Sequence, residues 1–298
     1  MELEWKKIEV QDRALFLPYL YSLASRSAET TFANLYLWSR QYPTGYAVVG
    51  DFLVMKSLEE EVFAFPAGTG DLRKIVEALD AYQRERGQAL AFQCVTREQF
   101  AQLEALFPGR FQIEYDRDYA DYVYDAEKLA NLSGKKYHGK KNHVNKFQKQ
   151  YPDWSYEPMT ADNLEDCFQM ALIWRRENGC EEDVEKNAEM CVALNALRLF
   201  TELSMEGGVL RVGGEVVAFT LGEQACEDTF VVHIEKARAD IDGAYTMINQ
   251  QFVQHALLGK YKYVNREDDV GAEGLRKAKL SYHPAFMVDK GYVTEREG

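Results

Sequence analysis

The chain has 298 residues, of which 46% are hydrophobic and 13% aromatic. This length is enough for two domains of ordinary size, and the composition excludes an intrinsically disordered protein. The net charge of −13, from 35 lysines and arginines against 48 acidic residues, argues against a protein that wraps nucleic acid over its whole surface. Charges are screened within about 8–10 Å at physiological salt, so a local basic cluster can still bind phosphate.

Membrane, disulfide and metal proteins are also disfavoured. There is no run of 18 uncharged apolar residues, and the first residues, MELEWKKIEV, lack the apolar core of a signal peptide, so we expect no transmembrane segment. The five cysteines form no CxxC pair, which indicates reduced thiols and a cytoplasmic location. The five histidines form no HExxH or HxH pattern, so we expect no metal site.

The first half alternates short strands and helices. In chain order we expect a strand at 3–10, a helix after Asp12, a helix within 30–42, strands at 46–50, 51–57 and 61–66, a helix at 70–87, a strand at 89–95, a helix at 97–107 and a strand at 118–125. Asp71 is the expected N-cap of helix 70–87. The apolar residues of that helix recur at helical spacing: Leu72, Ile75, Val76 and Leu79.

The second half repeats this order. We expect helices at 160–178 and 185–203, a hairpin at 208–223, a strand at 228–236, a helix at 243–258, a strand at 261–267, a helix at 272–282 and a strand at 285–293. The first of these helices has Thr160 or Asp162 as its expected N-cap. The hairpin turns at Gly213-Gly214, between two β-branched runs.

The repeated order is that of GCN5-related N-acyltransferases. The sequence therefore predicts an α/β protein with mixed sheets, built from two tandem GCN5-related N-acyltransferase-like domains. Their expected extents are residues 1–130 and 153–298, with a basic connecting helix at residues 131–152.

That connecting segment, SGKKYHGKKNHVNKFQKQY at 133–151, holds six lysines and no acid. As a helix it would be anchored by Tyr137, Val144 and Phe147. One interpretation is a solvated helix neutralised by acidic neighbours. The other is a surface that binds a phosphate-bearing ligand. The candidate binding residues are Lys135, Lys136, His138, Lys140, Lys141 and Asn142.

A second charged segment, NREDDVGAEGLRKAKLSYHP at 265–284, begins where a buried strand should end, and ligands gather at strand ends in such sheets. Its charges also suit a helix dipole, with acids first and bases last. Acyl transfer from an ester to an amine needs a general base, oxyanion donors and an acid. Glu267 or Asp268 is the candidate base, and Tyr282 the candidate proton donor or stacking residue. The candidate phosphate ligands here are Arg266, Arg276 and Lys279.

His233, which shares a strand face with Glu235, is either a second candidate base or a hydrogen-bonded core histidine.

Two segments, DYADYVYDAEKLANLSGKKYHGKKNHVNKFQKQYP and VNREDDVGAEGLRKAKLSYHP, together resemble the phosphatidylglycerol lysyltransferase C-terminal domain family, in its soluble branch formerly called a domain of unknown function. The resemblance implies a tandem acyltransferase fold related to Fem-type peptidyltransferases. It also implies an aminoacyl-tRNA donor, whose acceptor end would be bound, and a lipid head group, peptide or small amine as acceptor. The lysyltransferase carries a large transmembrane flippase domain that this chain does not show, which weakens the case for a lipid acceptor.

Two alternatives stay open. An acyl-CoA-dependent N-acyltransferase would carry a Gly-rich phosphate turn before the helix at 243–258, where this chain has only Gly243, flanked by Asp240 and Asp242. In the first half, Gly68 and Gly70 suit a loop and helix cap as well as a phosphate turn. The other alternative is a non-catalytic binding module on the same fold. We expect aminoacyl-tRNA or acyl-CoA as co-substrate and no tightly bound cofactor.

Overall fold

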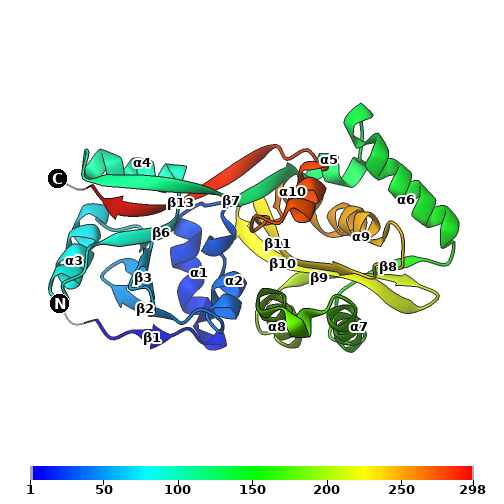
Figure 1. Ribbon diagram of the computed structural model, residues 1–298, viewed down its shortest axis with the longest axis horizontal. Helices are drawn as coiled ribbons and strands as arrows, with labels where there is room; N and C mark the ends of the chain where they lie inside the picture. The colour runs from blue at the N-terminus through cyan, green and yellow to red at the C-terminus, as the bar shows by residue number, and fades with distance from the viewer. Residues whose placement is uncertain (1–2, 297–298) are drawn as a thin grey trace. The chain divides into compact units, whose positions relative to one another are not determined.

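The computed structural model describes residues 3–296, which divide into two compact units (Figure 1). Unit 1 takes residues 3–121, 268–273 and 287–296 of this range, and unit 2 takes residues 122–267 and 274–286. Each unit therefore combines segments that lie far apart in the sequence. The predicted division into 1–130, 131–152 and 153–298 stays a prediction.

Unit 1 is a mixed sheet with four α-helices among the described residues. Its helices are α1 (Arg13–Ser22), α2 (Phe32–Trp38), α3 (Leu72–Arg84) and α4 (Arg97–Leu106). Its strands are β1 (Lys6–Lys7), β2 (Thr44–Val49), β3 (Phe52–Ser57), β4 (Phe63–Ala64), β5 (Ala67–Gly68), β6 (Ala91–Thr96), the first part of β7 (Phe111–Asp125) and most of β13 (Phe286–Glu295). The strand order is β1-β2-β3-β4-β6-β13-β7, with β5 paired to β3.

The late strand β13 lies inside this sheet. It runs antiparallel to β6, with Lys290 opposite Thr96, and its other neighbour is β7. Val293 of β13 is fully buried in the same hydrophobic cluster as Phe92 and Phe111. The core of unit 1 therefore depends on residues from the C-terminal end of the described chain.

Unit 2 repeats the architecture with longer strands. Its helices are α5 (Ala126–Asn131), α6 (His138–Gln150), α7 (Leu164–Glu177), α8 (Val184–Arg198), α9 (Ala244–Phe252) and α10 (Glu273–Leu280). Its strands are the end of β7, then β12 (Tyr263–Asn265), β11 (Thr229–Ala237), β10 (Glu215–Cys226), β9 (Glu206–Val212) and β8 (Ser155–Pro158), in that spatial order. Helices α7 and α8 lie on one side of β9 and β10, and α9 lies on the other (Figure 1). None of the helices within residues 3–296 is long and apolar enough to cross a membrane.

Local signals account for several element ends. Asp71 caps α3 as predicted, since its carboxylate accepts a hydrogen bond from the Lys74 amide at 3.2 Å. The hairpin of β9 and β10 turns at Gly213 and Gly214, whose φ values of 60° and 84° fit the predicted two-residue turn. The predicted cap of α7 was wrong, because Asn163 is its N-cap residue. The Thr160 amide instead donates to the Asn163 side chain at 2.8 Å.

The basic segment is a docked helix of unit 2. Residues 138–150 form α6, preceded by a short 3-10 turn at Lys135–Tyr137. As predicted, Tyr137, Val144 and Phe147 anchor it, and they belong to one hydrophobic cluster with Ala244 and Met247 of α9. The lysines of α6 are therefore presented from a fixed helix.

Candidate functional site

The two parallel strands of unit 2 separate at their C-terminal ends. β11 and β12 pair only from Thr229 opposite Tyr263 to Val231 opposite Asn265. β11 continues to Ala237, whereas β12 ends at Asn265. Residues that follow Asn265 lie at the opening between the strands, the place beyond the last pair where β11 continues without β12, as the contacts of Arg266 with Glu235 and of Glu267 with His233 show. This is the place where ligands are expected in open α/β sheets.

A β-bulge positions His233 at this opening. Opposite β11, Leu221 of β10 pairs with Ile234 and Gly222 pairs with Val232, so His233 is an extra residue between them. The bulge needs a glycine on β10, because a Cβ atom on Gly222 would lie 1.9 Å from the carbonyl oxygen of Val231. The sequence LGEQ of β10 therefore provides both the space for the bulge and the acid, Glu223, that follows it.

Glu267 is held in an unusual backbone conformation just after β12. Its φ is 58°, in the left-handed region that costs a non-glycine residue about 1–2 kcal/mol. Its amide donates to Asn265 Oδ1 at 2.7 Å, and its carbonyl oxygen accepts from the Tyr122 amide at 3.1 Å. The Arg266 amide donates to the Tyr122 carbonyl oxygen at 3.0 Å. These bonds fix the direction in which both side chains leave the strand.

His233 lies between two carboxylates. Its Nδ1 is 2.7 Å from Glu267 Oε1, and its Nε2 is 3.2 Å from Glu223 Oε1. The side chains of His233 and Glu223 are 5% and 4% exposed, and that of Glu267 is 25% exposed. Burial alone would lower the pKa of His233, but the hydrogen bonds and charges of Glu223 and Glu267 raise it to about 10. His233 is therefore an imidazolium at neutral pH that donates to both carboxylates.

A basic and aromatic group adjoins this pair. Arg266 forms an ion pair with Glu235 at 2.7 Å, and both side chains are largely buried. The Arg266 guanidinium lies 4.9 Å from the ring centroid of Tyr282, and Lys140 Nζ of α6 lies 3.8 Å from the same centroid. Tyr282 itself is buried, and burial raises its pKa. Of the predicted residues, Lys140, Arg266 and Tyr282 therefore come together in unit 2.

Two polar atoms of this interior have no hydrogen-bond partner among the described residues. They are Oγ1 of Thr220 and Oδ1 of Asn249, and both side chains are buried. Thr220 stands directly opposite Glu235 across β10 and β11, and Asn249 of α9 donates from Nδ2 to Glu235 at 3.3 Å. Buried polar groups are nearly always bonded, so unbonded ones around Glu235 mark a place suited to a polar ligand group.

The remaining predicted residues have other surroundings. The side chains of Lys135, Lys136, His138, Lys141 and Asn142 are exposed. Lys279 is buried, and its ammonium donates to the Arg266 carbonyl oxygen at 2.6 Å, so it holds the turn after β12. Arg276 is half-buried on α10. Most of the basic segment is thus a solvated helix face, and Lys140 is the member that reaches the site.

Asp268 belongs to unit 1, where it faces Lys290. The carboxylate oxygens of Glu29, Asp121 and Asp268 lie within 4.8 Å of one another. Lys290 Nζ forms ion pairs with all three, at 2.8 Å to Asp121 and 3.7 Å to Asp268. Burial alone would lower the pKa of Lys290, but these carboxylates raise it well above its usual value. Lys290 therefore already neutralises these three carboxylates, as a bound metal cation would.

In unit 2, α6 packs against the segment before α9, where a coenzyme A phosphate turn would lie. A Cβ atom on Gly243, the residue before α9, would lie 3.1 Å from the His143 carbonyl oxygen of α6. Lys146 of α6 also forms an ion pair with Asp242. In unit 1, a Cβ atom on Gly68 would lie 2.1 Å from the Asp51 carbonyl oxygen, so this glycine serves close packing of β5 on β3.

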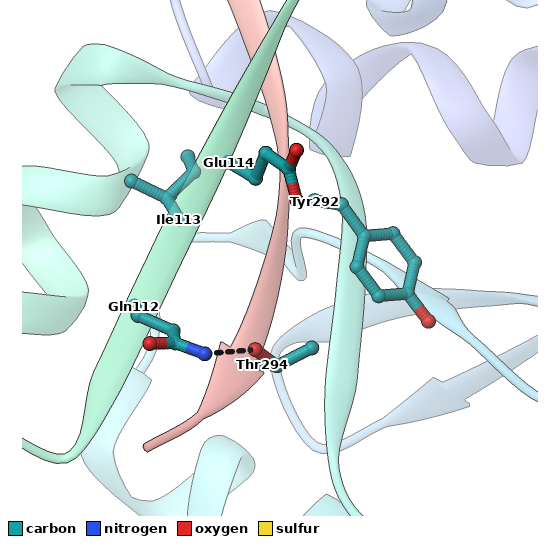
Figure 2. Close-up of a pocket in the computed structure, with 5 residues that line it drawn as sticks. All are labelled: Gln112, Ile113, Glu114, Tyr292 and Thr294. Carbon is teal, nitrogen blue, oxygen red and sulfur yellow. Dashed lines mark hydrogen bonds between the residues drawn. The ribbon is translucent and has the colours of Figure 1, made fainter. Parts of the chain in front are cut away.

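A surface pocket of about 250 Å³ lies elsewhere, in unit 1 (Figure 2). It is lined by Gln112, Ile113 and Glu114 of β7 and by Tyr292 and Thr294 of β13. Figure 2 shows the Gln112 amide bonded to the Thr294 hydroxyl across these strands, at 3.2 Å. The pocket contains no predicted site residue.

Two acids of the site were not among the predicted site residues. Glu235 shares a strand face with His233 on β11, and Glu223 lies on the neighbouring strand β10. A signal existed for both, because each is an acid inside a strand whose other residues are mostly apolar. Acids are rarely buried without a partner, so such residues are site candidates.

Solved structures of known proteins are similar to this chain over nearly its whole length. A conserved protein of unknown function from Bacteroides thetaiotaomicron VPI-5482 is 38% identical, with a TM-score of 0.93 over 99% of this chain and 100% of that chain. The C-terminal domain of a candidate lysylphosphatidylglycerol synthetase from Agrobacterium fabrum is 15% identical, with a TM-score of 0.67 over 97% and 92% of the two chains. L-PGS from Bacillus licheniformis is 15% identical, with a TM-score of 0.58 over 98% and 94%.

At 15% identity, the similarity to the last two structures shows a shared fold and no more. The predicted fold class is confirmed: mixed α/β, with two tandem GCN5-related N-acyltransferase-like domains. A curated relative, an uncharacterized protein of Mycoplasmoides gallisepticum, is 25% identical over 177 residues, and the match spans 55% of that protein's length.

The family model described as phosphatidylglycerol lysyltransferase, C-terminal, matches residues 21–293. At a coarse level, this family is one of acyltransferases. The chain belongs to the phosphatidylglycerol lysyltransferase C-terminal family.

Proposed function

We propose that unit 2 transfers an aminoacyl group from aminoacyl-tRNA to an amine or hydroxyl acceptor. The observation that carries this proposal is the Glu267 carboxylate, held 2.7 Å from His233 at the opening between β11 and β12. A carboxylate fixed at strand ends is placed to act on a bound substrate. The family's description as a lysyltransferase agrees with this chemistry.

Glu267 is the general base of the proposed reaction. Its carboxylate takes the proton from the acceptor nitrogen or oxygen as that atom attacks the ester carbonyl carbon. A new C–N or C–O bond forms, and the ester C–O bond to the ribose breaks. The leaving ribose oxygen takes up the proton that Glu267 removed, so the step restores the Glu267 carboxylate and needs no oxidant, reductant or covalent enzyme intermediate. Glu267 is the more exposed member of its pair with His233, as contact with substrate requires.

His233 is a positioning residue in this scheme. Its Nδ1–H donates to Glu267, and its other nitrogen is held by Glu223. The imidazolium offsets the charges of two carboxylates in a buried place, where unpaired charges are costly. Arg266 lies next in sequence to Glu267 and is itself paired with Glu235. Positive groups placed near the reacting carbonyl of a bound substrate would stabilise the developing oxyanion.

The α6 helix favours an aminoacyl-tRNA donor over acyl-CoA. A coenzyme A diphosphate would need the amides at the start of α9, where α6 packs and where Asp242 adds negative charge. The exposed lysines of α6 suit an RNA phosphate backbone instead. The acceptor is a small amine, a peptide or a lipid head group, in keeping with the family.

The test uses the whole chain. We expect purified protein to release a labelled amino acid from charged tRNA into a product when offered small amines, a lysine-containing peptide and phosphatidylglycerol vesicles in separate reactions. We expect Glu267→Gln to lower kcat/KM by about 10²–10⁴-fold, the usual contribution of a general base. Glu202→Gln, at an exposed position of unit 2, is the control and should leave the rate unchanged.

Other outcomes discriminate between the alternatives. Full activity of Glu267→Gln would remove Glu267 from the mechanism. Transfer from acetyl-CoA but from no charged tRNA would establish the acyl-CoA alternative. Ligand binding with no transfer from any donor would support the alternative of a non-catalytic binding module.

A further inference from the structure

Lys140 is a partly shielded lysine whose ammonium has no oxygen acceptor. Most lysines within residues 3–296 are exposed. Of those that are not, all but Lys140 donate from Nζ to a carboxylate or a backbone carbonyl oxygen: Lys56, Lys236, Lys279 and Lys290. The Lys140 ammonium makes no hydrogen bond or ion pair with any residue that the structure describes, and it lies 3.8 Å from the ring centroid of Tyr282.

The groups around Lys140 supply no counter-ion of its own. Arg266, whose guanidinium lies 4.9 Å from the same ring centroid, is a second cation, and it takes Glu235 as its ion-pair partner at 2.7 Å. Burial raises the pKa of Tyr282, so the phenol beside Lys140 stays neutral. Helix α9, which packs on α6, carries Tyr245 as its titratable side chain, and the hydroxyl of Tyr245 is bonded to α7 instead.

Burial and a neighbouring cation both favour loss of the Lys140 proton. Burial, and after it the charge of Arg266, lower the pKa of Lys140 to about 8, while Glu235 acts in the opposite direction. On α6 and the turn before it, Lys136 and His143 lie one helical turn to either side and add no negative charge. About a tenth of Lys140 is therefore a free amine at pH 7, against less than about 0.1% of an ordinary lysine.

We propose that Lys140 is a nucleophilic amine and a site of covalent acylation by a small activated acyl compound of the acyl phosphate class. A desolvated lysine beside another cation is an established way of making this side chain nucleophilic in proteins. Lys140 is half-buried, so a small reagent reaches it from solvent. This inference goes beyond the proposed function and does not depend on it, because no tRNA takes part.

The acylation step needs no reagent besides the acyl phosphate. The lone pair of the neutral Nζ atom attacks the acyl carbon, a C–N amide bond forms, and the C–O bond to phosphate breaks. Phosphate leaves with the electron pair of that bond and takes up the proton that the nitrogen loses. The product is a neutral amide, so acylation removes one of the two positive charges beside Tyr282.

The test measures limited acetylation of the folded wild-type protein by acetyl phosphate, read by peptide mass spectrometry after digestion with a protease that does not cut at lysine. Lys146 is the control on the same helix, because its ion pair with Asp242 raises its pKa. At pH 7 we expect Lys140 to react about tenfold or more faster than Lys146, since far more of it is neutral. In urea, where the fold is lost, both lysines should react at the same rate.

The dependence of the rates on pH tests the physical cause. The rate at Lys140 should rise up to about pH 8 and then level off, whereas the rate at Lys146 should go on rising above that pH. Arg266→Gln removes the neighbouring cation, so it should move the levelling of the Lys140 rate to higher pH. The wild-type profile decides the matter by itself where this variant does not fold.

Three results would overturn the proposal. They are equal rates at Lys140 and Lys146 in the folded protein, a Lys140 rate that goes on rising above pH 8 as that of Lys146 does, or an unshifted profile in folded Arg266→Gln. The proposed aminoacyl transfer can fail without changing any of these readings, because they record only the mass of the Lys140 and Lys146 peptides. The two proposals are therefore tested separately.

Discussion

At the scale of single residues, His233 keeps a proton that an isolated histidine would lose near neutral pH. The cause is its burial between Glu223 and Glu267, whose hydrogen bonds outweigh the cost of burying the charge. The proton fixes the hydrogen-bonding role of the ring, because an imidazolium can only donate. Glu267 is thereby held as an acceptor, which the proposed base must be.

The first prediction concerns this proton and stability. The folded-state pKa of His233, about 10, lies above its ordinary value of 6.5. Its contribution to the free energy of unfolding is therefore full below about pH 6.5 and is lost as the pH rises towards 10. We expect urea unfolding of the wild-type protein to show falling stability across this window. His233→Gln should flatten the fall, and an unchanged slope would show that His233 is not the group responsible.

The sequence could single out Glu267 and Arg266, because charged residues directly after a buried strand are conspicuous. It could not supply their partners. Glu223 and Glu235 reach the site through strand pairing and a bulge, and Lys140 reaches it through the docking of α6. Asp268 shows that adjacency in the sequence does not place two side chains in the same site. It is the sequence neighbour of Glu267, yet its carboxylate belongs to the ion network of Lys290 in unit 1.

At the scale of elements, the bulge of β11 depends on one residue of the neighbouring strand. Gly222 leaves room for the Val231 carbonyl oxygen, and no other residue type has the space. The bulge in turn aims His233 at Glu223 and Glu267. A change on β10 should therefore act on the site through β11, without altering a residue that touches substrate.

We predict that Gly222→Ala lowers transfer activity and stability together, the latter by about 1–3 kcal/mol, as overpacking of a buried site does. The measurements are kcat/KM and urea unfolding, with the His233 imidazole NMR signals as the local readout. Gly214→Ala, in the turn of the neighbouring hairpin with open space around it, is a control for the loss of a glycine from β9–β10. It should leave the imidazole signals in place, and a shift as large as that of Gly222→Ala would argue against the bulge.

Element types were more predictable than element ends. Asp71 caps α3 as its sequence position indicates, and the apolar residues of α6 anchor it as their spacing indicates. The start of α7 was misplaced, because Thr160, Asp162 and Asn163 are all good capping residues and only the contacts within the fold choose among them. Periodicity reports which face is buried, and it says little about the residue at which a helix begins.

At the scale of the whole molecule, each unit contains a strand segment that lies far in the sequence from the rest of that unit or that continues from the other unit. β13 completes the sheet of unit 1, and the end of β7 pairs with β12 in unit 2. The repeated element order predicted two similar architectures. It could not reveal this arrangement, since an isolated strand pattern does not name its neighbour.

We predict that residues 1–130 alone do not fold into unit 1. They lack Val293 of the core, whose burial is worth about 1.5–3 kcal/mol, and Lys290, the ion-pair partner of the buried Asp121, whose loss costs about 3–5 kcal/mol. Adding a peptide of residues 285–296 should restore the dispersed NMR spectrum of unit 1. The same peptide with Lys290→Ala should restore less, and a well-folded 1–130 fragment without any peptide would refute the expectation.

The place of β13 has a consequence for biosynthesis. A nascent chain emerges from the ribosome N-terminus first, but unit 1 can close only after residues 287–296 have been translated. Until then the edges of β6 and β7 that pair with β13 lack their partner strand and are open to misassociation. Slow or interrupted translation of residues 287–296 should therefore expose this protein to aggregation and to chaperones more than the stability of the folded molecule would suggest.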